Sequence, residues 1–268
     1  METQGEWFGM KRTWGVLLAL TLALSVLAGC GRQSSHIEQI KKAGVLKVGV
    51  KEDVPKFGYL NPQTNQYEGM EIDLARRIAK EILGDENKVQ FQGVNAKTRG
   101  PALDNGEVDL VIATFTINEE RKKSWNFSEP YFTDYIGFLV RADSGITSWK
   151  DLDGKNIGVA QSATTKQALT AQAEQDGIKP NFLEFATYPE IKAALDSGRV
   201  DAFSVDQSIL WGYKDDKNVM LPDKFAPQEY GVATKKSSTD LAELVDKLIK
   251  DMKASGELDQ LYEKWGLK

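Results

Sequence analysis

The sequence predicts an α/β protein built as two lobes of similar design. Three observations lead to this fold class: strands alternate with helices, the alternation restarts after about residue 143, and two extended stretches link the halves. Alternation of this kind produces mostly parallel sheets covered by helices. The extended stretches, residues 135–141 and 228–234, would form a two-strand hinge and return the C-terminal helices to the first lobe.

The first half supplies three strands and two helices. The expected strands are residues 46–50, 89–91 and 108–113, the last being a nearly continuous apolar run typical of a buried parallel strand. Residues 75–83 carry apolar side chains at helical spacing and end at Gly84. Gly100-Pro101 opens the second helix, because proline suits a first turn.

The second half repeats this order. Its expected strands are residues 157–160, 182–185 and 201–205, and its expected helices are residues 165–175, 189–195 and 209–213. Residues 239–253 are apolar at helical spacing, and a final piece ends at 261–266. Gly-Xaa-Val-Asp recurs at residues 106–109 and 198–201, which indicates either duplication or a common helix-to-strand turn.

The first thirty residues predict export and a lipid anchor. Lys11 and Arg12 precede an uncharged apolar run, residues 14–27, that is shorter than the roughly 20 residues needed to cross a bilayer. Residues 27–30, Leu-Ala-Gly-Cys, resemble the bacterial lipobox, which implies a signal peptide over 1–29 and a lipidated Cys30 followed by a tether to residue 39. A plain secretory signal with an incidental cysteine is the alternative.

Composition excludes several classes of function. Cys30 is the only cysteine, so a disulfide framework or a thiolate metal site is excluded. His36, the only histidine, falls in the expected tether, which argues against histidine catalysis and a histidine-rich metal site. The net charge is −5 and the charges are mixed, without the basic clusters of a nucleic-acid patch. We expect no metal, no cofactor and no nucleic-acid partner.

The chain resembles the family-3 extracellular solute-binding proteins, which are receptors of amino-acid ABC importers. The matching stretches are residues 44–50, 69–75, 106–109, 116–121, 127–132, 152–159 and 200–206. The resemblance implies a two-lobed, periplasmic-binding-protein-like (Venus-flytrap) fold of class II, whose lobes close over a ligand. It implies lobe 1 at residues 40–139 and 230–268, and lobe 2 at 140–229. It further implies a monomer outside the cytoplasm that delivers its ligand to a membrane permease.

Five residues are expected to bind the amino-acid backbone of the ligand, and three of them, Arg121, Thr116 and Asp206, match family positions for this role. Arg121 would grip the α-carboxylate with its planar fork, aided by Thr116 and by Thr114 on the same face. Thr164 begins a helix, where N–H groups favour an anion, and Asp206 would accept the ammonium. The alternatives are a surface ion pair for Arg121, helix caps for Thr164 and Asp206, and strand packing for Thr114.

The residues expected around the ligand side chain are mostly basic or aromatic. Lys51 and Arg99 would bring two further positive charges, which a second ligand carboxylate would satisfy. Together with Tyr188 they resemble the aspartate/glutamate-binding branch of the family. Phe115 and Tyr188 could sandwich the aliphatic part, although Phe115 lies between Thr114 and Thr116 and faces them only if the strand has ended. Solvated surface bases are the alternative for Lys51 and Arg99.

The sequence therefore predicts a receptor for aspartate or glutamate, with glutamine or another polar amino acid as the alternative ligand. An exported dehydratase and a surface sensor or adhesin share the fold. The dehydratase would need placed acids or bases, and neither a histidine in the lobes nor a pair of carboxylates stands out. We expect a binding protein and not an enzyme.

Overall fold

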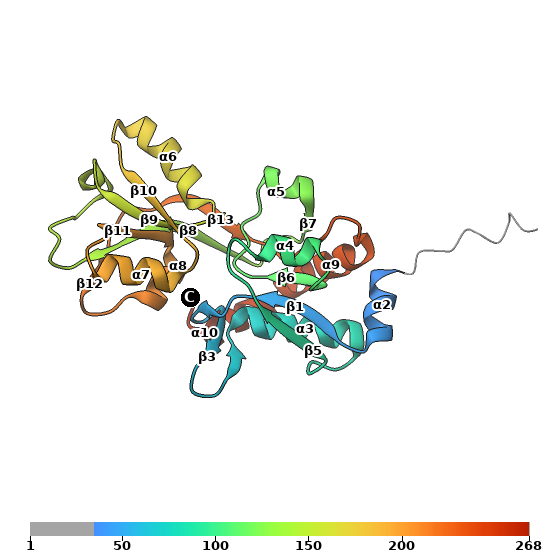
Figure 1. Ribbon diagram of the computed structural model, residues 1–268. Coiled ribbons are helices and arrows are strands. Elements are labelled where there is room, and N and C mark those ends of the chain that lie inside the picture. The colour runs from blue at the N-terminus through green and yellow to red at the C-terminus, as the bar shows by residue number, and fades with distance from the viewer. Residues whose placement is uncertain (1–34, 268) are drawn as a thin grey trace, which may run out of the picture. The chain divides into compact units, whose positions relative to one another are not determined.

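The computed structural model describes residues 35–267, and it confirms the α/β fold with two lobes (Figure 1). The expectations for Cys30 and the signal peptide lie outside the described residues. The first lobe contains strands β1 (Leu46–Val50), β5 (Val89–Gly93), β6 (Leu110–Ile112), β7 (Trp125–Phe127) and β14 (Ala233–Lys235), a small sheet of β2 (Asp53–Val54), β3 (Gly58–Asn61) and β4 (Gln66–Glu68), and helices α2 (His36–Ala43), α3 (Met70–Leu83), α4 (Arg99–Asp104), α5 (Glu119–Ser124), α9 (Thr239–Ser255) and α10 (Glu257–Trp265).

The second lobe is built around one sheet. It contains strands β8 (Phe132–Arg141), β9 (Asn156–Ala160), β10 (Asn181–Phe185), β11 (Ala202–Asp206), β12 (Asn218–Met220) and β13 (Phe225–Tyr230), the short 3₁₀ helix η1 (Trp149–Leu152), and helices α6 (Thr165–Asp176), α7 (Tyr188–Asp196) and α8 (Gln207–Tyr213). In Figure 1, α6 lies above this sheet and α7 and α8 lie below it.

The first sheet has the order β5-β1-β6-β14-β7, in which β1 pairs in parallel with β5 and β6. Strand β14 comes from the end of the chain and lies between β6 and β7, antiparallel to both. Helices α3 and α4 both pack on β1, one on each side in Figure 1. The C-terminal segment therefore contributes a strand to the sheet of the first lobe.

The second sheet has the order β10-β9-β11-β8-β12, with β13 paired to β8. Strands β10, β9 and β11 are parallel, whereas β8 is antiparallel to its neighbours. Strand β13 pairs with β8 from Tyr230 opposite Phe132 to Phe225 opposite Ile136, so residues 132–134 and 228–230 lie side by side where the chain crosses. The first expected hinge stretch, residues 135–141, is therefore placed a few residues too late. The chain enters the second sheet along β8 and leaves it along β13.

The expected tether ends earlier than the sequence predicts, because α2 begins at His36. Ser35 caps this helix by accepting a hydrogen bond from the Glu38 backbone N–H. His36 contacts the hydroxyl of Ser238 at 2.6 Å and the carboxylate of Asp109 at 2.9 Å. These contacts fix a short, mostly polar helix onto the first lobe, so His36 has a structural role there.

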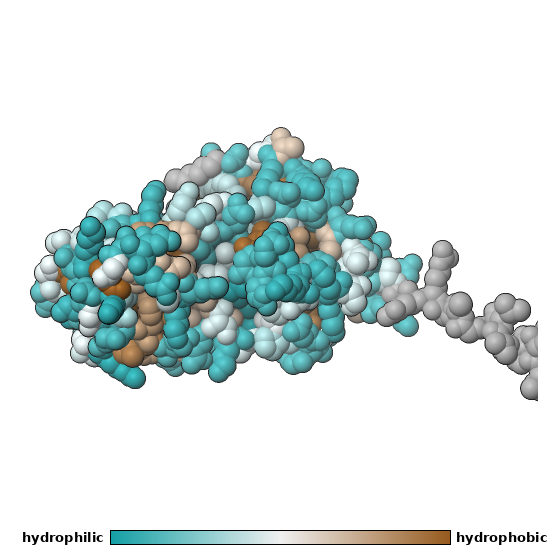
Figure 2. All heavy atoms as spheres, turned by 90° about the horizontal axis from the view of Figure 1, so that it is seen from above, coloured by the Kyte–Doolittle hydropathy of each residue, from teal (hydrophilic) through white to brown (hydrophobic). Residues whose placement is uncertain are grey.

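The face of the molecule shown in Figure 2 is mostly hydrophilic, with apolar residues in scattered patches. Only three large apolar side chains are exposed among the residues described: Tyr135, Trp211 and Val219. None of the helices within residues 35–267 is long and apolar enough to span a bilayer. The apolar side chains instead fill the cores between sheets and helices.

Candidate functional site

The predicted site residues gather at the carboxyl ends of four strands. Lys51 follows β1, Thr114 follows β6 after one residue, and Asp206 ends β11. Thr164 follows β9 and stands immediately before α6. The carboxyl edge is where open α/β sheets bind ligands, and here edges from both lobes contribute.

The chain leaves the regular strand before Thr114, which settles the orientation of Phe115. Strand β6 ends at Ile112, and Thr114 has a φ of +45°, which is rare for a β-branched residue. Phe115 is buried, and its ring packs against two guanidinium groups, Arg99 at 4.2 Å and Arg121 at 4.8 Å. The Phe115 ring therefore packs against both guanidinium groups and helps to hold them in place.

Arg121 takes part in the site and not in a surface ion pair. Its Nη1 donates to the Thr116 carbonyl at 2.7 Å, and its Nη2 donates to the Ser162 carbonyl of the second lobe at 3.0 Å. The neighbouring acids pair elsewhere, Glu119 with Lys122 and Glu120 with Lys123. Burial, reinforced by the charge of Arg99, lowers the Arg121 pKa to about 9.

Arg99 is almost fully buried and is held by backbone carbonyls. Its Nη1 donates to the carbonyls of Ala113 and Thr114 at 2.6 and 2.9 Å. Within the described residues its Nε is buried without a hydrogen-bond partner. Burial lowers the pKa of Arg99, and the alternative of a solvated surface base is wrong.

Glu71 holds the backbone at Thr114, the residue whose carbonyl binds Arg99. Its Oε1 accepts hydrogen bonds from the Thr114 N–H and from the Tyr131 hydroxyl, each at 2.6 Å. Glu71 is completely buried, and burial raises its pKa. Thr114 is therefore a link between an acid on α3 and a base on α4: its N–H binds Glu71 and its carbonyl binds Arg99.

Lys51 is buried, but its charge has a partner. Its Nζ lies 3.0 Å from Asp53 Oδ1 and 4.3 Å from the centre of the Tyr188 ring on α7. Burial lowers the Lys51 pKa and the Asp53 carboxylate opposes that shift. The expectation that Lys51 brings an uncompensated charge is therefore wrong, because the acid two residues along the chain turns back to it.

Asp206 and Thr164 do not cap the helices that follow them. Neither side chain makes a cap hydrogen bond; the Thr164 hydroxyl instead donates to Gln228 Oε1 at 2.6 Å. Asp206 accepts a hydrogen bond from Tyr230. Burial, together with the nearby charge of Asp134, raises the Asp206 pKa to about 7.

The site joins the two lobes directly. Tyr188 covers Lys51, Ser162 accepts from Arg121, and the Tyr213 hydroxyl donates to the Asp53 carbonyl. The nine residues expected from the sequence all lie among these contacts between the lobes or next to them. The arrangement presents guanidinium groups at one end and a carboxylate, Asp206, at another, which suits a small zwitterion.

Sequence reasoning missed five buried or partly buried polar residues that complete the site: Asp53, Glu71, Asp134, Gln228 and Tyr230. Asp53 was detectable, because residues two apart on an extended chain share a face. The hydrogen-bond partners of Glu71 and Gln228 lie 43 to 112 residues away, and no periodic pattern marks such contacts.

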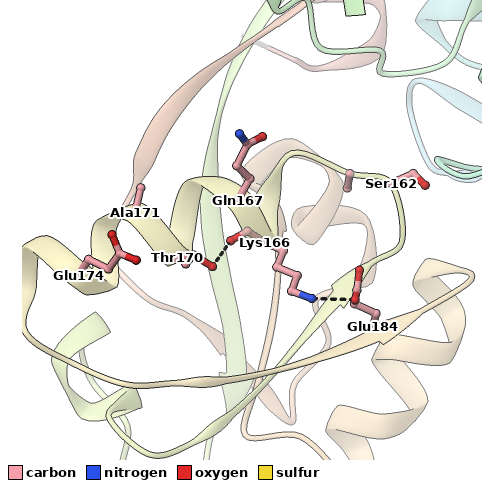
Figure 3. Close-up of a pocket in the computed structure, with 8 residues that line it drawn as sticks. Ser162, Lys166, Gln167, Thr170, Ala171, Glu174 and Glu184 are labelled. Carbon is pink, nitrogen blue, oxygen red and sulfur yellow. Dashed lines mark hydrogen bonds and ion pairs between the residues drawn. The ribbon is translucent and has the colours of Figure 1, made fainter. Parts of the chain in front are cut away.

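A second hollow lies on the surface of α6 and borders this site at Ser162. Its volume is about 500 Å³, and Figure 3 shows Lys166 and Glu184 paired across it at 2.8 Å. It is lined by Ser162, Ala163, Lys166, Gln167, Thr170, Ala171, Glu174 and Glu184. In the described part of the chain, no cluster of His, Cys, Asp or Glu side chains could hold a metal ion.

Two α/β lobes that meet over a site for a small zwitterion define a ligand-capturing binding protein. The chain belongs to the bacterial extracellular solute-binding proteins, family 3, whose model matches residues 46–268. This membership places it among the amino-acid-binding components of ABC transporters, outside the cytoplasm.

Three relatives are named for amino-acid binding. An ABC transporter glutamine-binding protein, GlnH, of Bacillus subtilis is 38% identical over 96% of this chain and 97% of that protein. A glutamine-binding protein of Geobacillus stearothermophilus is 40% identical, over 85% and 95%. An L-glutamate/L-aspartate-binding protein of Pseudomonas aeruginosa is 30% identical, over 93% and 85%.

A solved structure supports the same fold. An ancestral arginine-binding protein bound to glutamine matches with a TM-score of 0.74 and 35% identity, over 83% of this chain and 97% of that one.

Proposed function

We propose that this receptor captures glutamine and delivers it to its ABC importer. The observation that carries the proposal is the pairing of Lys51 with Asp53, 3.0 Å apart and nearly buried beside Tyr188. A carboxamide has an oxygen that accepts and an NH₂ that donates, so a lysine and an aspartate together match both of its halves. The two relatives named for glutamine, at 38% and 40% identity, support the same ligand.

A second candidate, an acidic amino acid, is favoured by Arg99 and Arg121. Both guanidinium groups are largely buried, and within residues 35–267 neither lies within ion-pair distance of a carboxylate. A buried charge without a partner costs several kcal/mol, roughly 3–5, and two carboxylates on one ligand would relieve both. The relative named for glutamate and aspartate, at 30% identity, supports this reading.

Calorimetric titration separates the two candidates. The full chain, purified in detergent, is titrated with glutamine, glutamate, aspartate and arginine. Tightest binding of glutamine supports the first proposal, and tighter binding of glutamate or aspartate supports the second. Tightest binding of arginine would contradict both.

The variant Asp53→Asn tests the role given to the Lys51–Asp53 pair. It removes the acceptor charge facing the carboxamide and leaves the Lys51 charge uncompensated, so glutamine should bind more weakly and glutamate more tightly. Glu52→Gln is the matched control, because this neighbouring acid is exposed. Equal losses for both ligands would mean that Asp53 supports the fold and does not select the side chain.

We further propose that Cys30 carries a lipid that holds the receptor, as a monomer, at the membrane beside its permease. The order of Leu27, Ala28, Gly29 and Cys30 supports this proposal. The variant Cys30→Ser should move the protein from the membrane fraction to the soluble fraction. A protein that stays with the membrane after this change would refute the anchor.

A further inference from the structure

Gln228 lies between the two lobes beside the amino-acid site, and the ligand contacts proposed above give it no role. It lies on β13, the strand along which the chain leaves the second sheet, and is almost fully buried. Its Oε1 accepts two hydrogen bonds, from the Thr116 hydroxyl at 3.0 Å and from the Thr164 hydroxyl at 2.6 Å. Thr116 belongs to the first lobe and Thr164 to the second.

The orientation of the Gln228 amide follows from its other bond. Its Nε2 donates to the Ala226 carbonyl at 3.0 Å, which only the nitrogen can do, so the oxygen faces the two threonines. Each threonine hydroxyl has a single hydrogen, and in this arrangement both hydrogens point at Gln228. The hydroxyl oxygens are left with lone pairs, which suit hydrogen-bond donors on a ligand.

The two bonds of the Gln228 oxygen, taken together, require the lobes to meet. Thr116 lies in the first lobe, where its carbonyl accepts a hydrogen bond from Arg121 of α5. Thr164 is fixed in the second lobe at the start of α6. One oxygen can bind both hydroxyls only when these two elements meet over it.

We propose that Gln228 is a positioning residue that couples lobe closure to ligand capture by gathering Thr116 and Thr164 onto one oxygen. The inference rests on the proposed amino-acid site at these two threonines. Gln228 orients the two hydroxyls and adds an attraction that only the closed form gains, and so it tightens binding without being assigned a ligand contact of its own.

The test is a double-mutant cycle on ligand affinity and dissociation rate. Gln228→Met, which removes the acceptor at similar volume, should raise the Kd for the tightest-binding amino acid about 10- to 100-fold, mostly through faster dissociation. Thr164→Val should cost a similar factor. The double variant should lose little more than either single variant, because both remove one interaction.

Two further measurements keep the inference falsifiable. Gln228→Asn, which withdraws the oxygen by one methylene, should give the same loss if Gln228→Met fails to fold. Gln167→Met, on the outer side of α6, is the matched control and should leave the Kd unchanged. Small-angle scattering should show that the compaction caused by ligand is smaller in Gln228→Met than in the unaltered protein.

The outcomes separate this inference from the proposed function. If the unaltered protein binds no amino acid, the proposed function fails, and this inference fails with it. If it binds one, and Gln228→Met binds equally tightly or the losses in the double variant simply add, the coupling role is refuted while the proposed function stands.

Discussion

Lowering the pH should weaken ligand binding through Asp206. This carboxylate ends β11 inside the site, where burial and the charge of Asp134 raise its pKa from 3.8 to about 7. The ammonium of an amino acid pairs with the ionised carboxylate only. Below the pKa the ligand must first displace a proton, so affinity should fall as the pH falls through about 7.

The magnitude follows from the fraction of Asp206 that is ionised. At about pH 5, two units below the pKa, roughly one molecule in 100 is ionised, so the Kd should be about 100-fold higher than at about pH 8. The groups that face Asp206 are Tyr230, which donates to it, Asp134, which repels it, and Arg99 and Arg121, which attract it. The side chain of glutamine does not titrate in this pH range, so the pH dependence of glutamine binding reports the ionisation of Asp206 alone.

Calorimetry from about pH 5 to about pH 8 measures this dependence. Asp134→Asn should lower the midpoint, because it removes the charge that helps to raise the Asp206 pKa. The stability of the unliganded protein should change in the opposite direction. The folded state holds the Asp206 proton more tightly than the unfolded state does. The contribution of Asp206 to the free energy of unfolding therefore decreases as the pH rises from about 4 to about 7. A Kd that is constant over this range would refute the argument.

Three other variants test separate parts of the site. Arg121→Ala should raise the Kd for every amino acid at least about 100-fold, because the ligand carboxylate loses a charged partner worth about 3 kcal/mol or more; micromolar binding in calorimetry would exclude its role. Gly212→Ala places a methyl group of the second lobe 3.0 Å from Pro55 of the first lobe, which should destabilise the closed form by about 1 kcal/mol. The Kd should therefore rise about fivefold, while the thermal unfolding temperature stays unchanged. Glu71→Gln keeps an acceptor for Thr114 but removes the acid, so titration with glutamate and glutamine should show a shift toward glutamate; an unchanged ratio would mean that Glu71 carries no charge in the site.

The sequence predicts the strands and helices well because their apolar patterns are local. Residues 46–50 and 165–175 correspond to β1 and α6 within one residue at each end, and Gly84 and Gly177 end helices in the left-handed conformation. Helix α2 was missed because its stability comes from contacts with Asp109, Ser238 and Asp240 far along the chain. A short polar segment gives no periodic signal of such contacts.

The site was predicted one residue at a time, whereas its chemistry depends on pairs. Lys51 and Arg99 are both basic in the sequence and suggest the same ligand. In the structure Lys51 has Asp53 beside it, while Arg99 has carbonyls and, through Thr114, Glu71. The number of positive charges that a ligand meets is therefore smaller than the number of basic residues.

The charge that the site prefers in a ligand side chain depends on the proton of Glu71. With Glu71 ionised, the two bases expected near the ligand side chain each have an acid close by, Lys51 with Asp53 and Arg99 with Glu71, and a neutral side chain such as that of glutamine would fit. With Glu71 protonated, one positive charge is left over, and a side-chain carboxylate would balance it. Burial raises the Glu71 pKa and so favours the second state as the pH falls. On the proposed function we therefore predict that lowering the pH shifts the preference of the site from glutamine toward glutamate, through a carboxyl group that no ligand is expected to touch.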